Sequence, residues 1–215
     1  MRIPLAKDGL PYVIGLLLIS GLLLWHFPIA ALFCLVTSIC VAAFFRDPER
    51  DVVLEEGAML SPADGRIISI TDIADGDGAH GPHRRLAVFM SVFNCHVNRS
   101  PIKGVVEDVE HTPGRFNAAF ARDAGEVNER NAIRVIDETG EEVLFTQIAG
   151  LIARRIVCQT SPGDQIEPGQ RIGLIKFGSR VDVVIPPTYS ICVNVGDKVK
   201  AGLHVIARRL DDDLL

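Results

Sequence analysis

The apolar positions of the chain divide it into two unlike parts. Residues 11–45 contain no Asp, Glu, Lys or Arg, and their apolar run is interrupted most clearly at residues 26–28. As helices with a rise of 1.5 Å per residue, residues 11–25 would span about 22 Å and residues 27–45 about 28 Å, against a hydrocarbon core about 30 Å thick. The pattern therefore predicts a hairpin of two short helices, transmembrane or re-entrant, in an N-terminal domain of residues 1–46.

Charges on either side of this hairpin predict its orientation. Arg2 and Lys7 precede the apolar run, and Arg46 and Arg50 follow it. Because positively charged flanks stay on the cytoplasmic side of a membrane, both ends of the hairpin are expected there. The segment is too long for a secretory signal, and no small-residue cleavage site follows it. We therefore expect a protein of the cell (inner) membrane whose second domain, residues 47–215, lies on the cytoplasmic face.

Short apolar runs punctuated by Gly, Pro and Asp fill the second domain. Runs such as residues 86–93, 142–148 and 181–185 have the length and the β-branched content of strands, and only residues 116–124 look briefly helical. We therefore expect a mainly β domain with few short helices.

A repeat in the last third of the chain narrows the expected fold. The sequence GDQIEPGQRI of residues 163–172 matches GDKVKAGLHV of residues 196–205 at a period of 33 residues, and we call these the first and second Gly-Asp units. In each unit Gly-Asp opens a turn, a branched residue enters the core and the second glycine turns the chain back. Together with SPADGRI at residues 61–67, the pattern resembles barrel-sandwich proteins. The resemblance predicts a duplicated, hybrid or lipoyl-like β core.

The same repeat leaves open a function other than that of an enzyme. In the lipoyl and biotinyl carrier domains of that fold, the modified lysine lies on a hairpin shortly after the first such unit, where this chain has Lys176. A membrane-anchored carrier modified on Lys176 is therefore an alternative. The sequence FGSR at residues 177–180 fits an ordinary turn, in which Gly178 supplies a positive φ, or a strained turn that presents a reactive Ser179.

Composition excludes several classes of function. The formal net charge of -5 and the absence of a basic run with interleaved aromatic residues argue against nucleic-acid binding. The five cysteines have neither the close pairing of a disulfide framework nor a metal-ligand spacing such as C-x-x-C. We therefore expect a reducing compartment and no metal.

Five short motifs in a fixed order carry a resemblance to a known family. They are FFRDPER at residues 44–50, FNCHVNRSP at 93–101, NERN at 128–131, GLIARRI at 150–156 and FGSR at 177–180. Together they resemble the phosphatidylserine decarboxylase family in its short, bacterial form, and the likeness covers nearly the whole chain. The resemblance implies a pyruvoyl-dependent lyase that converts phosphatidylserine in the membrane to phosphatidylethanolamine.

The resemblance also implies that the chain cleaves itself. Ser179 would attack the carbonyl of Gly178, and the acyl group would move from nitrogen to oxygen. Elimination and hydrolysis would then leave a pyruvoyl group at position 179 and release ammonia. Glycine on the acyl side leaves the carbonyl unhindered and tolerates a distorted turn. The products, residues 1–178 and 179–215, are expected to stay together as a heterodimer, and a homodimer of these pairs is left open.

Four further residues are candidates for this chemistry. A serine hydroxyl needs a base, and His96 is the candidate, with Asp64 as the carboxylate that fixes its tautomer, as in Ser-His-Asp enzymes. Longer members of the family carry two histidines three residues apart. Here His96 matches the first and Arg99 replaces the second, so His96 serves cleavage, protonation after decarboxylation, or both. Arg99 and Arg180 are expected to hold the substrate phosphate or carboxylate, with ordinary salt bridges as the alternative.

Overall fold

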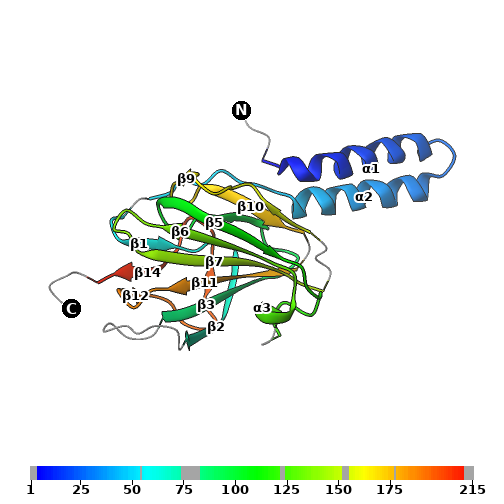
Figure 1. The fold of residues 1–215 in the computed structure, drawn as a ribbon. Helices are drawn as coiled ribbons and strands as arrows, with labels where there is room; N and C mark the ends of the chain where they lie inside the picture. The colour runs from blue at the N-terminus through cyan, green and yellow to red at the C-terminus, as the bar shows by residue number, and fades with distance from the viewer. Residues whose placement is uncertain are drawn as a thin grey trace.

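A pair of antiparallel helices projects from one end of a β domain, as Figure 1 shows. The computed structural model describes residues 4–53, 55–73, 83–121, 124–151, 155–176 and 178–210. Within these ranges the helices are a 3-10 turn at Lys7–Gly9, α1 at Leu10–Leu23, α2 at Pro28–Phe44 and the single turn α3 at Ala124–Val127. Helices α1 and α2 form the hairpin that the apolar run predicts.

Hydroxyl groups tie the two hairpin helices together. The Ser20 Oγ donates to the carbonyl of Ala31 at 2.8 Å, and the Ser38 Oγ donates to the carbonyl of Val13 at 3.2 Å. Most side chains that face away from this contact are apolar and exposed, up to 89% for Trp25 at the tip. No helix in the described ranges combines the length and the apolar character needed to cross a membrane, so the predicted transmembrane span is not confirmed.

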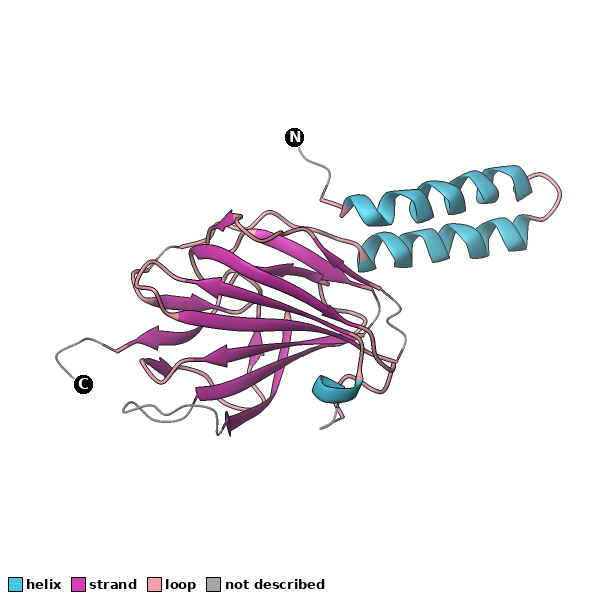
Figure 2. Cartoon of the chain, viewed as in Figure 1, coloured by secondary structure: helices cyan, strands magenta, loops and turns pink. Residues whose placement is uncertain are grey.

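The β domain is built from antiparallel strands (Figure 2). Their bounds in the described chain are Ala58–Leu60 (β1), Gly65–Ile73 (β2), His83–Met90 (β3), Val97–Arg99 (β4), Gly104–Thr112 (β5), Arg130–Ile136 (β6), Glu142–Ala149 (β7), Ile156–Cys158 (β8), Gln165–Ile166 (β9), Arg171–Ile175 (β10), Ser179–Ile185 (β11), Tyr189–Ile191 (β12), Lys198–Val199 (β13) and Val205–Arg209 (β14). One sheet has the order β13-β2-β3-β11-β7-β6-β5-β9, and two smaller sheets have the orders β1-β14-β12 and β4-β10-β8. The prediction of a mainly β domain with few short helices is confirmed.

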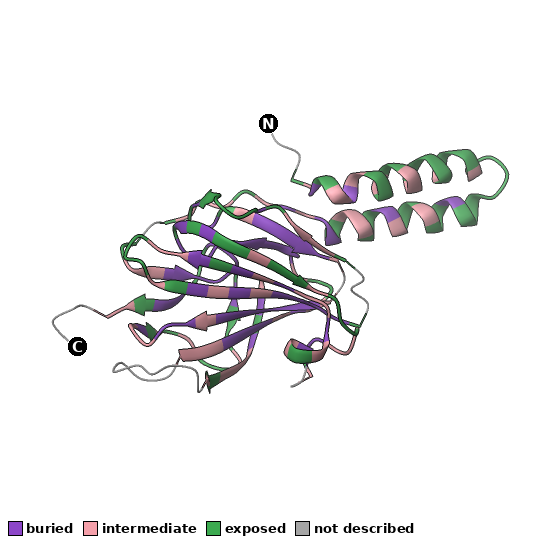
Figure 3. Ribbon diagram, viewed as in Figure 1, coloured by how far each residue is buried: buried purple, intermediate pink, exposed green. Residues whose placement is uncertain are grey.

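The curled large sheet encloses an apolar core (Figure 3). Leu86, Ile133, Phe145 and Val183, from four neighbouring strands, are completely buried within it. Burial alternates along β6, as expected where one face of a strand meets the core and the other meets solvent. The β11 strand lies in the middle of this sheet, between β3 and β7.

The two Gly-Asp units form the same turn. The Asp164 side chain accepts a hydrogen bond from the Ser161 N–H at 2.8 Å, and the Asp197 side chain accepts one from the Asn194 N–H at 2.8 Å. Both units begin with a glycine in the left-handed region, where a side chain would be strained. The sequence repeat is therefore also a repeat of local structure.

The strands that receive the two units are equivalent as well. The first unit donates from Gly163 N–H to the carbonyl of Val106 in β5, and the second donates from Gly196 N–H to the carbonyl of Ile67 in β2, both at 2.8 Å. The pairings β5–β6 and β2–β3 each shift register close to these acceptors. The β2/β13 edge of the large sheet thus has a structural counterpart at the β5/β9 edge.

Candidate functional site

Ser179 begins β11 and is completely buried. It lies opposite Met90 on β3 and Ala149 on β7. Among the described residues, the one hydrogen-bond contact of its Oγ is with the Met90 Sδ at 4.0 Å, which is a weak acceptor at the limit of contact. The hydroxyl is therefore held in the core without a strong partner.

The residue before Ser179 adopts a conformation that suits glycine. Gly178 has a φ of 62°, in the left-handed region where a Cβ is unfavourable. A Cβ built on Gly150 would overlap the carbonyl oxygen of Gly178, so that oxygen packs against the Gly150 backbone. Phe177 and residues 152–154, which belong to the sequence motifs, lie outside the described residues. The two glycines thus define the position of the Gly178 carbonyl.

His96 lies in the β3–β4 loop, which follows Met90 and so leaves β3 beside Ser179. The carbonyl of His96 accepts a hydrogen bond from the Ile175 N–H at 3.4 Å, at the end of β10 that leads into the Gly178 turn. The β3–β4 loop and the β10–β11 connection are therefore neighbours. No hydrogen bond between the His96 ring and Ser179 occurs in the described part of the chain.

The His96 ring has one nitrogen engaged and one free. Its Nδ1 lies 3.0 Å from the carbonyl oxygen of Asn94, and because a carbonyl only accepts, Nδ1 carries the proton. Its Nε2 is buried and has no hydrogen-bond partner within the described ranges. Burial lowers the pKa of His96 to about 4, so the ring is neutral near pH 7 and Nε2 presents a lone pair.

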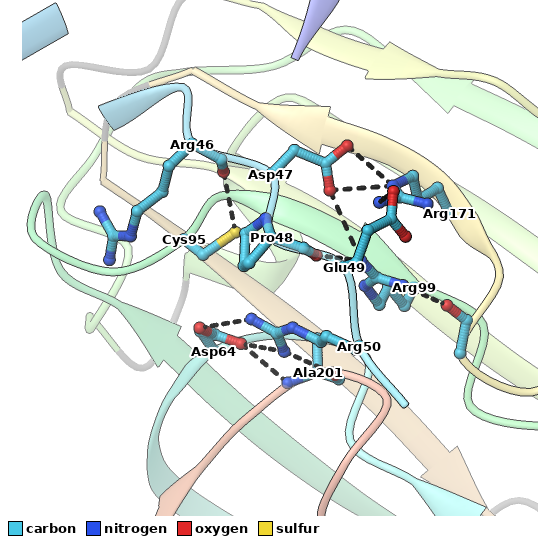
Figure 4. A network of polar contacts seen from close by, with 11 residues as sticks. Arg46, Asp47, Pro48, Glu49, Arg50, Asp64, Cys95, Arg99, Arg171 and Ala201 are labelled. Atoms are coloured by element: carbon cyan, nitrogen blue, oxygen red, sulfur yellow. Dashed lines mark hydrogen bonds and ion pairs between the residues drawn. The ribbon is translucent and has the colours of Figure 1, made fainter. Parts of the chain in front are cut away.

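Asp64 is engaged by other groups than His96 (Figure 4). Its two oxygens accept hydrogen bonds from Arg50 at 2.7 and 2.9 Å, and one also accepts from the Ala201 N–H at 2.8 Å. No hydrogen bond joins Asp64 to His96 across the described chain, and the Asn94 carbonyl occupies Nδ1 instead. The charge of Asp64 nevertheless acts to raise the pKa of His96, against the larger effect of burial.

Arg99 is a buried structural cation in this arrangement (Figure 4). Its guanidinium donates to the carbonyls of Gly169 at 2.8 Å and Pro48 at 3.0 Å and lies 3.5 Å from a carboxylate oxygen of Asp47. Burial lowers its pKa, with the Arg171 charge acting in the same direction. The guanidinium is thus surrounded by protein acceptors.

The guanidinium group of Arg180 is also occupied by a partner inside the protein. It donates to both oxygens of Asp182, at 2.5 and 2.6 Å, and both residues are about 5% exposed. Burial raises the pKa of Asp182, and the Arg180 hydrogen bond opposes that rise. The two residues are separated by one position on β11 and so share a face of the strand.

The base of the helical hairpin packs onto the same region. The Phe44 ring lies on the His96 ring with 4.1 Å between centroids, and Tyr12 stacks on Phe45 at 5.9 Å. The Lys176 Nζ, two residues before Gly178, lies 3.8 Å from an Asp8 oxygen and 5.6 Å from the centroid of the Tyr12 ring. We call Asp8, Tyr12 and Phe44 the hairpin base.

A chain of buried amides reaches this region and was not predicted from the sequence. Gln147 on β7 donates to the Asn98 Oδ1 at 2.9 Å, and Asn131 on β6 donates to Gln147 at 3.4 Å. The Asn98 Nδ2 contacts the same Met90 sulfur as Ser179, at 3.5 Å. The signal was present, because Asn98 and Asn131 belong to the FNCHVNRSP and NERN motifs.

Comparison with known proteins identifies the family. The family model described as phosphatidylserine decarboxylase matches residues 38–207, which include Asp64, His96, Gly178 and Ser179. The chain belongs to the phosphatidylserine decarboxylase family. The resemblance drawn from the five motifs is thereby confirmed, and the carrier alternative, with its modified Lys176, gains no support.

Curated members of the phosphatidylserine decarboxylase family match almost the whole chain. A phosphatidylserine decarboxylase proenzyme from Solidesulfovibrio magneticus is 45% identical, and the alignment covers 96% of this chain and 97% of the relative. A proenzyme of the same name from Desulfotalea psychrophila is 41% identical, and the alignment covers 96% of this chain and 97% of the relative. One from Ralstonia nicotianae is 43% identical, with 94% of each chain covered. The likeness therefore extends beyond the matched family model into the helical hairpin.

Proposed function

We propose that this chain is a self-cleaving, pyruvoyl-dependent decarboxylase that converts phosphatidylserine to phosphatidylethanolamine. Family membership supports the activity. The observation that carries the cleavage site is Ser179, which is fully buried directly after a left-handed glycine. Within the described ranges, the one hydrogen-bond contact of its hydroxyl is with a sulfur atom. A serine with a purely structural role in a core would be expected to hydrogen bond.

Cleavage begins with the hydroxyl of Ser179 and the carbonyl of Gly178. The Oγ adds to the carbonyl carbon, and the bond to the Ser179 nitrogen breaks, so that an ester replaces the amide. Loss of the proton on the Ser179 Cα expels the Gly178 carboxylate by β-elimination. One water then replaces the nitrogen at Cα, which leaves as ammonia, and a ketone remains.

His96 is proposed as the base for the Ser179 hydroxyl. The support is its buried Nε2, which is unprotonated and without a partner in the described chain, in a loop beside the Gly178 turn. Asp64 is proposed to act through its charge, which favours the protonated ring, rather than through a hydrogen bond. The same proposal includes a second role for His96, the protonation of the product carbon after decarboxylation.

The residues around position 179 fit a pyruvoyl group. The Ser179 side chain has no strong hydrogen bond to lose among the described residues, and its conversion to a ketone adds no heavy atom to the packed site. A pyruvoyl group held there would supply a carbonyl that can bind the substrate amine and take up the electron pair released with CO2. Burial of Ser179 and His96 excludes bulk water from that carbon.

The rest of the proposal concerns the fold and the membrane. We propose a duplicated barrel-sandwich core, supported by the matching Gly-Asp turns, as the catalytic domain of residues 47–215. We propose that the hairpin of residues 1–46 inserts its exposed apolar side chains into the inner face of the cell membrane. Arg99 and Arg180 have internal partners, so the ordinary ion-pair role that the sequence left open suits them better than phosphate binding.

The variant Ser179→Ala tests the proposed function. It lacks the attacking hydroxyl, so we expect one unbroken chain and no ethanolamine lipid when the protein is given phosphatidylserine vesicles. The wild type should run as two chains in a denaturing gel and release CO2. Normal cleavage of Ser179→Ala, or decarboxylation by an unbroken chain, would contradict the mechanism.

A further inference from the structure

A cavity of about 620 Å³ lies beside the candidate site and is lined by cations. Its wall includes Arg46 at the end of α2, Arg66 on β2, and Lys198, Lys200 and His204 around the second Gly-Asp unit. Among the described residues of the wall, the one carboxylate is that of Asp64, which Arg50 neutralises through two hydrogen bonds. We call this the basic cavity.

The arginines and lysines of the basic cavity lack carboxylate partners within the part of the chain that the structure describes. Across the described ranges, no carboxylate forms an ion pair with Arg46, Arg66, Lys198 or Lys200. The hydrogen bonds of Arg46 run to the carbonyls of Ala43 and Phe93, and that of Arg66 to the carbonyl of Gly196. These neutral acceptors hold the guanidinium groups in place and leave their charge uncompensated.

The basic cavity can be compared with a second cavity at the corresponding edge of the large sheet. The β5/β9 edge, which corresponds to the β2/β13 edge, borders a second cavity of about 380 Å³. There Lys103 is 2.7 Å from Glu138, and Arg209 pairs with Asp137 and Glu141. Both cavities follow from the fold, but the cations that line the second cavity are paired with carboxylates, whereas the arginines and lysines of the basic cavity have no carboxylate partner among the described residues.

The loop that carries His96 also lines the basic cavity. Ser91 and Asn94 line it, and both belong to the β3–β4 loop. Ser91 follows Met90, the strand partner of Ser179, and the Asn94 carbonyl fixes the His96 tautomer. An anion in the cavity would therefore lie next to the loop that carries the proposed base.

The position relative to the hairpin indicates what kind of anion fits. Arg46 lies two residues after the end of α2, so the cavity lies where the apolar helices meet the β domain. In a phospholipid the phosphodiester occupies the corresponding place, between the acyl chains and the polar headgroup. Guanidinium and ammonium groups are the side chains that bind phosphate oxygens best.

We propose that the basic cavity binds the phosphodiester of the lipid substrate, with Arg46, Arg66, Lys198 and Lys200 as its cationic ligands. The inference rests on the proposed decarboxylase function. It moves the phosphate site away from Arg99 and Arg180, whose guanidinium groups are occupied inside the protein. It also makes the end of the hairpin part of the substrate site.

The double variant Arg66→Gln/Lys198→Gln tests this inference. Both side chains are exposed, so the fold and self-cleavage should be retained. With phosphatidylserine in mixed micelles we expect KM to rise at least about tenfold, because two charge-assisted contacts are lost, while kcat changes by less than about twofold. The matched control is Lys103→Gln/Arg134→Gln, which removes two cations from outside the cavity and should leave KM unchanged.

The sources of the anion are separated by two soluble probes. Glycerophosphoserine should inhibit the wild type competitively and the double variant at least about tenfold more weakly. An unchanged KM in the cleaved double variant would overturn the inference, as would equal inhibition of both proteins by glycerophosphoserine. Inorganic phosphate is the second probe. If the double variant is no longer inhibited by phosphate but keeps the wild-type KM for lipid, the inference is overturned, because the cavity would then be a site for free phosphate.

Failure of the inference is distinguishable from failure of the proposed function. If the wild type is cleaved and decarboxylates lipid, the function holds whatever the double variant does. If the wild type stays unbroken and inactive, the proposed function fails before the cavity is tested. Self-cleavage is therefore measured first in each protein.

Discussion

At the scale of single residues, the environment of His96 decides how it can act. The ring is buried beneath Phe44, its Nδ1 is held by a backbone carbonyl, and its Nε2 is left without a partner in the described chain. Burial costs the charged form more than the neutral form, which is why the pKa falls to about 4. The His96 ring is therefore unprotonated at neutral pH and in mild acid, as its proposed role as a base requires.

The first prediction concerns the pH dependence of self-cleavage. A base must be unprotonated, so the rate should fall as pH decreases through the pKa of His96. With that pKa at about 4, the rate should stay level from pH 7 to 5 and be halved near pH 4. An ordinary histidine would be half protonated at about pH 6.5. Quenched gel time courses across this pH range measure the midpoint.

The variant Phe44→Ala tests whether burial causes the low pKa of His96. Removing the ring lets water reach His96, so the midpoint should move upward toward the ordinary pKa. Phe93→Ala is the matched control, because Phe93 belongs to the same loop but is 84% exposed. A midpoint near pH 6.5 in the wild type, or one unmoved in Phe44→Ala, would show that burial does not set this pKa.

The sequence named the candidate residues but not their contacts. The motifs placed Ser179, Gly178 and His96, whereas the partner of Asp64 was wrongly expected by analogy with Ser-His-Asp enzymes, since Arg50 takes both oxygens. The Arg180–Asp182 pair could have been predicted, because residues two apart on a strand share a face. The Asn94 carbonyl at Nδ1 could not, since a loop contact depends on a backbone path that no periodicity describes.

At the scale of elements, the hairpin is joined to the region where cleavage is proposed. Asp8 and Tyr12 hold Lys176, two residues before the proposed cleavage site, while Phe44 covers His96. Hydropathy predicted the two helices and the break between them, because both are local properties of the sequence. It could not predict that their base packs on the β10–β11 connection, which is more than a hundred residues away.

The second prediction tests this contact. In Asp8→Asn/Tyr12→Ala the ion pair and the cation–π contact of Lys176 are lost together, at a combined cost of about 1 kcal/mol. Self-cleavage should slow by about fivefold if that energy is used to position the turn. The rate is followed from the unbroken chain in a cell-free synthesis reaction.

Trp25→Ala controls for general damage to the hairpin. Trp25 is 89% exposed and lies in the connection between α1 and α2, whereas Asp8 and Tyr12 lie at the other end of α1, so its variant should cleave at the wild-type rate. Equal rates in Asp8→Asn/Tyr12→Ala and the wild type would mean that the hairpin base does not position the cleaved turn.

At the scale of the whole molecule, the fold explains why cleavage need not separate the chains. The proposed small chain starts at Ser179, so it carries β11 in the centre of the large sheet between β3 and β7. It also carries β12, β13 and β14, and these pair with one another or with β1 and β2 of the large chain. Breaking one peptide bond removes none of these ladders.

The third prediction follows from that pairing. The two chains should elute together in size-exclusion chromatography without denaturant and separate only after unfolding in guanidinium. Val183 is completely buried, so dissociation would expose core surface at a cost far beyond thermal energy. A small chain that elutes by itself under native conditions would contradict the sheet order.

The duplication shows what the sequence could and could not predict about the whole fold. The two Gly-Asp units were visible as a repeat, and their turns are the same. The correspondence between the β2 and β5 regions was not recognised in the sequence, because the segments share few residues beyond Ser-Pro and a glycine. The basic cavity could not be predicted from the sequence, because the fold brings together residues near positions 46, 66, 91 and 200 to form its walls.

The most direct test of the central claim is the intact mass of the purified wild-type protein under denaturing conditions. The account predicts two chains, residues 1–178 and residues 179–215, the second lighter by one ammonia than a peptide that begins with serine. Treatment with borohydride should add two hydrogens to that second chain alone, as expected for a ketone. A single unbroken chain, or a lipoyl or biotinyl adduct on Lys176, would contradict the account.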